Sequence, residues 1–120
     1  IYGDALEWMK RLAKRGDRHD LVILDPPTFS RSKQSGVFLA KRDYGSLTKA
    51  AAPLVRNGGM LLACCNAAGL SNVKFREEVR RGIRASGRKI VGAFLAMQPP
   101  DFPVTKTEPA YLKVSWLRLD

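Results

Sequence analysis

The fold of this chain is decided by the stretch LVILDPPTFS, residues 21–30. Its first four residues are leucine or β-branched side chains without a polar interruption, which is the pattern of a buried parallel strand. Pro26 and Pro27 neither extend a sheet ladder nor start a helix smoothly, so they impose a rigid turn on the end of that strand. Ligands of open α/β sheets bind at this end of the strands. Asp25, which is held on the stiff turn, is therefore a candidate site residue.

Helix and strand patterns alternate outward from this stretch. Apolar spacing predicts helices over residues 5–14, capped by Asp4, over residues 47–55, and from residue 71 or 72 onward. Apolar runs predict strands over residues 20–24, 60–65, 89–96 and 111–119. We expect a mobile polar loop over residues 30–36 and a turn-rich connection over residues 98–103. This order predicts an α/β domain whose last two strands pair antiparallel.

Composition restricts the partners and the compartment. The net charge of +10 and the pI near 10.1 favour nucleic acid, although a basic proteome or an acidic region outside this chain would explain the same excess. Cys64 and Cys65 are adjacent, which disfavours a disulfide between them, and they lack metal-site spacing. A reduced, cytoplasmic setting without a metal fits best. No apolar stretch approaches the ~20 residues that span a bilayer, so we expect no membrane partner.

Several motifs in this order resemble the C-terminal part of class I S-adenosylmethionine-dependent methyltransferases. The resemblance is to the bacterial 23S ribosomal RNA enzymes whose relatives make 5-methylcytosine or 7-methylguanine. The matching motifs, spread over nearly the whole chain, are Gly3-Asp4-Ala5, Asp25-Pro26-Pro27-Thr28-Phe29-Ser30 with Ser32-Lys33, the Gly58-Gly59 pair that opens a strand, Asp101-Phe102-Pro103-Val104 and Tyr111-Leu112-Lys113. The second of these is fairly specific, whereas Gly-Asp-Ala alone is a weak signal.

The resemblance implies a Rossmann-like, three-layer αβα fold of which residues 1–120 are the C-terminal portion. The four strands would be the family's contiguous strands 4-5-7-6, with the last strand antiparallel. The glycine-rich cofactor loop would lie in an N-terminal half that is absent, and the start at Ile1 rather than methionine agrees with a piece of a longer protein. We expect this piece alone neither to bind S-adenosylmethionine tightly nor to turn over, and its first strand to be an unpaired edge.

The resemblance also implies roles for site residues. Asp4, with Ala5 beside it, would contact the adenine end of S-adenosylmethionine, a role compatible with capping a helix. The Asp25-Pro26-Pro27 turn would lie between the methyl donor and the target base. Asp25 would orient the ligands, and carbonyl groups held by the prolines would accept hydrogen bonds from the base. Phe29 would either stack on an extruded base or pack in the core.

The cysteines bear on the type of reaction. Carbon-5 methylation of cytosine needs a thiolate that attacks the ring. The resemblance places such a cysteine at one of two positions, which Thr28 and Asn66 occupy here, while Cys65 is one residue short of the second. Because a shift of one residue turns a strand side chain to the other face, Cys65 is not a simple substitute. Asn66 can instead bond a purine edge, so the sequence leans slightly toward nitrogen methylation.

Basic and aromatic residues near the Pro-Pro turn are candidate RNA contacts. With Thr28 and Phe29, they are Arg31, Lys33, Lys41, Arg42 and Tyr44. The alternative is a solvated basic loop. The sequence therefore predicts part of a methyltransferase acting on RNA, most simply ribosomal. The alternatives are a non-catalytic RNA-binding module derived from this fold and a methyltransferase with a non-RNA substrate.

Overall fold

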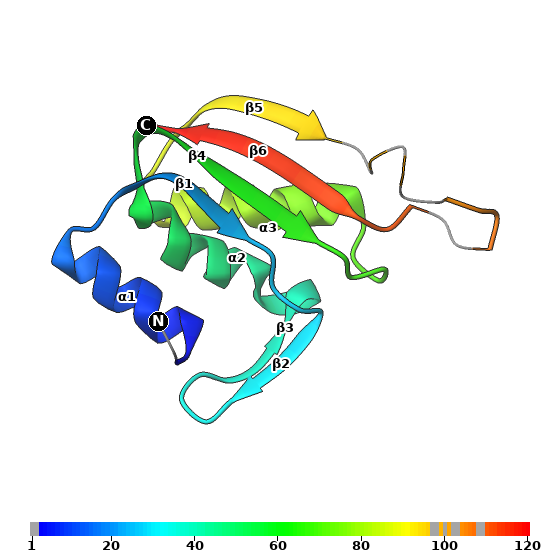
Figure 1. The fold of residues 1–120 in the computed structure, drawn as a ribbon, viewed down its shortest axis with the longest axis horizontal. Coiled ribbons are helices and arrows are strands. Elements are labelled where there is room, and N and C mark those ends of the chain that lie inside the picture. Colours follow the sequence, from blue (N-terminus) through cyan, green and yellow to red (C-terminus); the bar gives the residue numbers. More distant parts are fainter. Residues whose placement is uncertain (1–2, 97–98, 100, 102–103, 108–109) are drawn as a thin grey trace.

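A computed structural model describes residues 3–96, 99, 101, 104–107 and 110–120. Three α-helices alternate with the strands along the chain (Figure 1). The elements are α1 (Ala5–Arg15), β1 (His19–Leu24), β2 (Phe29–Ser32), β3 (Gly36–Leu39), α2 (Ala40–Ala51), the 3-10 turn η1 (Ala52–Leu54), β4 (Val55–Cys65), α3 (Asn72–Ala85), β5 (Ile90–Ala96) and β6 (Lys113–Leu119). Most of the predicted turn-rich connection over residues 98–103, and with it Phe102 and Pro103 of the late motif, lies outside the described residues.

Four strands form one mixed sheet in the order β1-β4-β6-β5. β1 is parallel to β4, with Leu24 opposite Ala63, whereas β6 runs antiparallel to both β4 and β5. This order and these directions confirm the predicted 4-5-7-6 half-sheet with an antiparallel last strand. β1 lies at one edge of the sheet, as expected, and β5 lies at the other.

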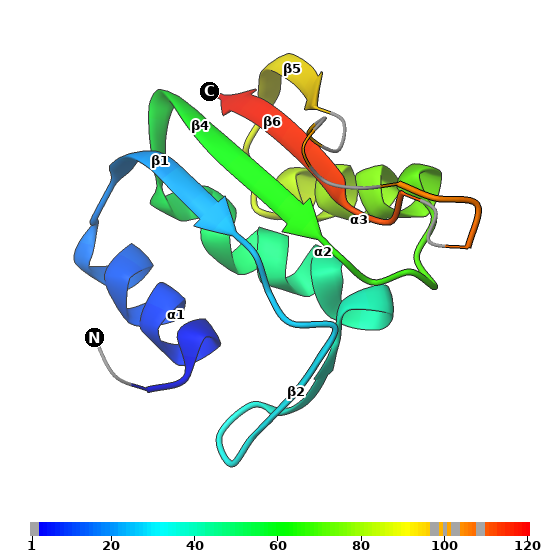
Figure 2. The same ribbon diagram turned by 45° about the vertical axis from the view of Figure 1, so that its right-hand side comes forward.

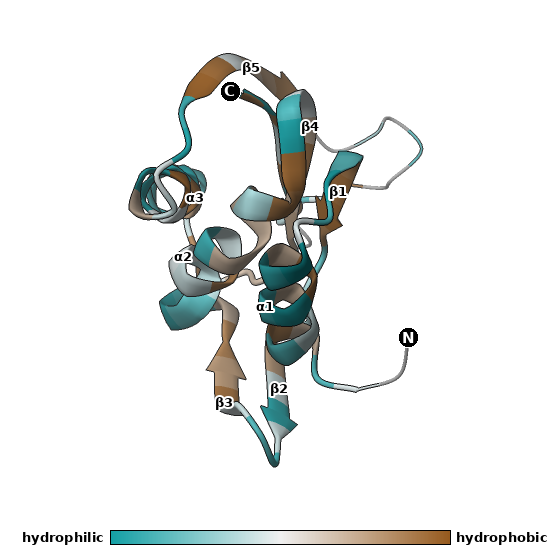
Figure 3. Cartoon of the chain, turned by 90° about the vertical axis from the view of Figure 1, so that its left-hand side faces the viewer, coloured by the Kyte–Doolittle hydropathy of each residue, from teal (hydrophilic) through white to brown (hydrophobic). Residues whose placement is uncertain are grey.

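All three helices lie on the same side of the sheet (Figure 3). In the inner strands, residues that face the helices are buried, as Leu61 and Leu117 are, and so is Leu24 at the end of β1. Ile23 and Phe94 on the opposite face are 58% and 57% exposed. The described chain therefore provides the sheet and one helical layer of the three layers that were expected.

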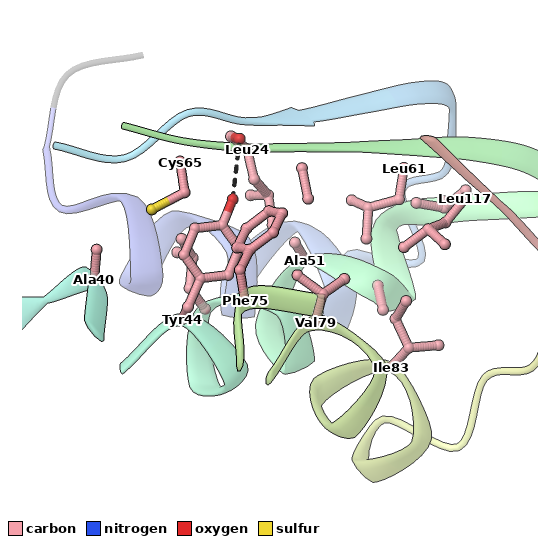
Figure 4. Close-up of a cluster of buried hydrophobic side chains, with 14 of the residues drawn as sticks. Leu24, Ala40, Tyr44, Ala51, Leu61, Cys65, Phe75, Val79, Ile83 and Leu117 are labelled. Atoms are coloured by element: carbon pink, nitrogen blue, oxygen red, sulfur yellow. Dashed lines mark hydrogen bonds between the residues drawn. The ribbon is translucent and has the colours of Figure 1, made fainter. Parts of the chain in front are cut away.

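The core lies between the sheet and helices α2 and α3. Tyr44 meets Phe75 edge to face with ring centroids 5.0 Å apart, and both side chains are buried with Val79 and Ile83 (Figure 4). The helices approach so closely that a Cβ on Gly82 would lie 2.4 Å from the Gly45 carbonyl oxygen. Small residues at this crossing therefore set how deeply α2 and α3 pack.

Two predicted elements differ for identifiable reasons, and the strand expected over residues 60–65 begins earlier, at Val55. Residues 30–36 are not an irregular loop, because Phe29–Ser32 and Gly36–Leu39 pair as an antiparallel hairpin that projects from the end of β1 (Figure 2). The helix expected over residues 47–55 begins earlier, at Ala40, and ends earlier, at Ala51. Pro53 has no amide hydrogen to continue the α-helical ladder, so a 3-10 turn follows and Val55 already belongs to β4.

No helix in the described part of the chain has both the length and the apolar character needed to cross a membrane.

Candidate functional site

The candidate site, here called the crevice, comprises the Pro-Pro turn and Asn66, which lie at the carboxyl ends of the neighbouring parallel strands β1 and β4. The Asp25-Pro26-Pro27 turn follows β1, and Asn66 follows β4. The Thr28 hydroxyl donates a hydrogen bond of 3.1 Å to Asn66 Oδ1, which joins residues 38 positions apart. Both of these side chains are exposed. The two segments singled out in the sequence therefore meet at one accessible edge of the sheet.

Helix α2 holds these strand ends in place. The Ala40 amide, at the start of α2, donates to the Thr28 carbonyl at 3.0 Å. The Tyr44 hydroxyl lies 2.6 Å from the Cys64 carbonyl oxygen and 3.3 Å from that of Leu24, so its single proton serves the ends of β4 and β1 (Figure 4). Burial is the main cause that raises the pKa of Tyr44 above its ordinary value. The hydroxyl therefore keeps its proton and remains a donor.

Tyr44 was expected among the RNA contacts, and this expectation is wrong. Its side chain is fully buried against Phe75. The signal was present in the sequence, since Tyr44 lies three and four residues before Leu47 and Thr48 and shares their buried helix face. It was missed because the helix was expected to begin only at residue 47.

Asp4 forms the other end of the site, at the start of α1. As predicted, it caps the helix, and its Oδ1 accepts from the Glu7 amide at 3.1 Å. Its Oδ2 accepts from the Ser35 hydroxyl of the hairpin at 2.6 Å. Hydrogen bonds from the Ser32 and Ser35 hydroxyls lower the pKa of Asp4 to about 2, so the carboxylate is ionised at neutral pH.

A pocket of about 560 Å³ lies between Asp4 and the Pro-Pro turn. Helix α1, strand β1, the turn and the hairpin all contribute to its walls, which are mostly apolar: Leu6, Met9, Leu12, Val22, Leu24, Phe38, Leu47 and Leu54. Polar groups converge at its ends, where Asp4, Asp25 and Ser35 line it. Its size and its mainly apolar walls with few polar groups are those of a small-ligand site.

The hairpin and the first turn of α2 carry the expected aromatic and basic side chains. Phe29 is 58% exposed, so the alternative that it packs in the core is wrong. Arg31, Lys33 and Lys41 are exposed and form no ion pair within the described residues. Arg42, by contrast, pairs with Asp43 at 2.7 Å and donates to the Val37 carbonyl at 2.9 Å. Arg42 thus fastens the hairpin to α2.

Neither cysteine has the environment of a nucleophile. Cys65 is fully buried and faces the helices, while Cys64 is half-buried on the other side of β4. Burial first, and then the nearby Asp25 charge, raise the pKa of the Cys64 thiol, so it stays protonated at neutral pH. Asn66 instead occupies the exposed position at the crevice. No cluster of three or more His, Cys, Asp or Glu able to hold a metal occurs among the described residues.

Several of these contacts were beyond the sequence patterns. The serines on Asp4 and the bond from Thr28 to Asn66 depend on segments that only the folded chain brings together. Lys113 is another case. Its buried ammonium group donates to the carbonyls of Ala67 at 2.9 Å and Tyr111 at 2.5 Å, and so anchors the loop after Asn66 to β6.

Comparisons with known proteins agree with this geometry. Residues 4–118 match the family of S-adenosylmethionine-dependent methyltransferases. A ribosomal RNA large subunit methyltransferase of Deinococcus radiodurans is 32% identical over 100% of this chain and 29% of its own length. The ribosomal RNA large subunit methyltransferase K/L of Methylococcus capsulatus is 43% identical over 55% of this chain and 9% of its own length.

Solved structures show the same fold. SMU.776, crystallised in complex with SAH, superposes with a TM-score of 0.82 at 26% identity, covering 98% of this chain and 30% of that one. An S-adenosylmethionine-dependent methyltransferase from Agrobacterium tumefaciens gives a TM-score of 0.60 at 18% identity over 97% of this chain and 37% of its own. The chain thus spans between 9% and 37% of the length of these relatives.

Proposed function

The chain belongs to the S-adenosylmethionine-dependent methyltransferase family, and we propose that the protein carrying it methylates a base of ribosomal RNA. The observation that carries this proposal is the hydrogen bond between Thr28 and Asn66, which unites the Pro-Pro turn with the end of β4 beside the pocket. The names of the relatives from Deinococcus and Methylococcus support ribosomal RNA as the substrate. A cytoplasmic location stays a prediction from the cysteine content.

Asp4 and Ala5 fit the adenosine end of S-adenosylmethionine. The pocket beside them has apolar walls suited to a purine ring, and Asp4 is ionised and can accept from an amino group. A carboxylate offers about four acceptor sites, of which the Glu7 amide and the Ser32 and Ser35 hydroxyls use about three. When bound, the cofactor supplies an electrophilic methyl group on a positively charged sulfur.

Asp25, Pro26, Pro27 and Asn66 form the substrate side of this proposal. The prolines restrict the backbone, so their carbonyl groups and Asp25 present acceptors in a fixed place to base NH groups. Asn66 bonds the base edge from the neighbouring strand, and exposed Phe29 stacks on the extruded ring. The protonated, partly buried Cys64 and the buried Cys65 favour a ring or exocyclic nitrogen as the methyl acceptor over cytosine carbon 5.

We further propose that residues 1–120 are the C-terminal portion of one catalytic domain. The exposed Ile23 and Phe94 on the uncovered sheet face, and the free edge of β1, are surfaces that a further helical layer and further strands would bury. The coverage of the relatives, 29% to 30% for the two that match nearly the whole chain, agrees with this. Micromolar binding of S-adenosylmethionine to the 120-residue chain alone, measured by calorimetry, would contradict the expectation that the cofactor site is incomplete.

Mass-spectrometric mapping of ribosomal RNA tests the function. Cells that lack the gene for the natural protein should lose one methylated base, and the gene should restore it. Asn66→Ala and Asp25→Asn should fail to restore it, while a Cys64→Ala/Cys65→Ala protein should succeed. An unchanged methylation map would refute ribosomal RNA as the substrate. If the cysteine variant folds but fails to restore the methylated base, the result would favour methylation of cytosine carbon 5 over nitrogen methylation. Cofactor binding that is absent from the natural protein while RNA binding persists would favour the non-catalytic module.

A further inference from the structure

Helix α3 leaves a groove beside the edge strand β5. The groove consists of two adjoining hollows. A shallow one of about 10 Å³ is lined by Arg76, Arg80 and Leu95, and a wider one of about 180 Å³ is lined by Asn72, Arg76 and Leu95. Leu95 is 66% exposed although its register places it on the helix side of the sheet. The groove is thus an accessible apolar strip with two guanidinium groups along one wall.

The two arginines are uncompensated within the described residues. Arg76 and Arg80 lie one helical turn apart, a spacing at which like charges repel and destabilise a helix. The acidic residues of α3 form ion pairs with other side chains, since Glu77 pairs with Lys74 at 3.4 Å and Glu78 pairs with Arg81 at 2.5 Å. Arg76 makes only a bond from Nε to the Asn72 carbonyl, which leaves its terminal NH₂ groups free. A bound anion from outside the chain would offset the repulsion between these two guanidinium groups.

The groove opens at the same end of the strands as the crevice, where β4 ends and β6 begins. Its wide end is bounded by Asn72 at the start of α3 and by Val114 near the start of β6. Lys113, next to Val114, pairs with Cys65 at the end of β4 and anchors Ala67 through its ammonium group. Asn66 is therefore separated from the mouth of the groove only by the start of β6 and the short loop that precedes α3.

We propose that this groove holds the sugar-phosphate backbone of the RNA strand that flanks the target nucleotide. Arginine guanidinium groups bind phosphate in a bidentate manner, and the apolar strip at Leu95 accepts the face of a ribose or base. The occupant is a single strand, because a base that is read at its edge and stacked on an aromatic side chain lies in unpaired RNA. The inference rests on the proposed function and adds a second contact region to the one formed by Arg31 and Lys33 on the hairpin and Lys41 at the start of α2.

Matched charge variants test the groove. Binding of a 12-nucleotide single-stranded RNA of mixed sequence is measured by fluorescence anisotropy for the 120-residue chain and for two double variants. The groove variant is Arg76→Gln/Arg80→Gln, and the control is Lys14→Gln/Lys49→Gln, which loses the same charge. The groove variant should bind on the order of tenfold more weakly, and the slope of log affinity against log salt should fall by about 1.4, which is about 0.7 for each lost phosphate contact. The control should change affinity less than about twofold, since its lysines lie on other helices. Thermal unfolding should stay at the same temperature or rise, because the groove variant removes a like-charge pair.

Each other outcome overturns the inference. An equal loss in both variants would mean that net charge alone drives binding, and a groove variant that binds as the wild type does would mean that RNA lies elsewhere. Displacement of the RNA by poly-glutamate at equal charge concentration would point to an acidic peptide instead. The function is judged separately in the natural protein. If the ribosomal RNA is methylated while the groove variant methylates normally, the groove is wrong and the function stands; if no ribosomal RNA base is methylated, the function fails.

Discussion

The two faces of the sheet differ more than any other two regions of this molecule. On the helix side, Leu61, Phe75, Val79 and Ile83 are at most 1% exposed, whereas Phe94 on the other side is 57% exposed. The strands have the same apolar character on both faces, so composition does not explain the difference. It arises because every described helix packs on one side. Buried area, rather than hydrophobicity, decides which side chains stabilise this chain.

The largest expected effect comes from the matched pair Phe75→Ala and Phe94→Ala. Truncating the buried Phe75 removes its contacts with Tyr44 and leaves a cavity, which should lower the free energy of unfolding by about 3–5 kcal/mol. Truncating the exposed Phe94 should change it by less than about 0.5 kcal/mol. Urea denaturation of the chain measures both. A comparable loss at Phe94 would mean that another copy or segment covers the open face.

A smaller effect is expected at the helix crossing. Gly82→Ala places a Cβ within 2.4 Å of the Gly45 carbonyl, so α2 and α3 must separate, at a cost of about 1–3 kcal/mol in the free energy of unfolding. Gly69→Ala is the control, since nothing lies within 4 Å of its Cβ. If thermal unfolding shows equal losses for both variants, the close packing of the helical side is not what limits stability.

Tyr44→Phe tests the link between the packed face and the crevice. It keeps the ring against Phe75 but removes the proton donor to the Cys64 and Leu24 carbonyls. The expected loss is about 1–2 kcal/mol in the free energy of unfolding. Amide hydrogen exchange should also quicken near the end of β4 and the Pro-Pro turn. Unchanged exchange there would show that Ala40 and Thr28 hold the turn without this hydroxyl.

The smallest effect concerns Asp4, where α1 meets the hairpin. Its pKa of about 2 in the folded chain lies below the 3.8 of an unperturbed aspartate, so the folded state favours the ionised form. This contribution is present above about pH 4 and is lost as the pH falls toward 2. Asp4→Asn retains a good helix cap, and its stability should lack this part of the acid dependence. Parallel pH profiles for the two proteins, from urea denaturation, would refute the contact of Asp4 with Ser32 and Ser35.

Local patterns predicted the elements and half of the site. Three features follow from residues that are close together in the sequence. They are the capping role of Asp4, the strand that ends at Leu24 and the helix that starts after Ser71. The sequence does not predict the hairpin, because Phe29–Ser32 is largely polar without apolar alternation and no pattern marks its pairing partner, Gly36–Leu39. Tyr44 is misassigned for a related reason, since its burial depends on where α2 begins.

The sequence by itself determined the order of the elements, the rigid Pro-Pro turn and the resemblance to the methyltransferase family, because periodicity, caps and prolines act through neighbouring residues. The tertiary structure decided which polar groups meet: Thr28 with Asn66, Asp4 with Ser35, and Lys113 with Ala67. These pairs are 31 to 46 residues apart, and no local pattern encodes them. Thr28 meets Asn66 because the parallel strands β1 and β4 end side by side, in a register that burial of one face fixes. The other two pairs form because the hairpin folds back to the start of α1 and because β6 pairs with β4.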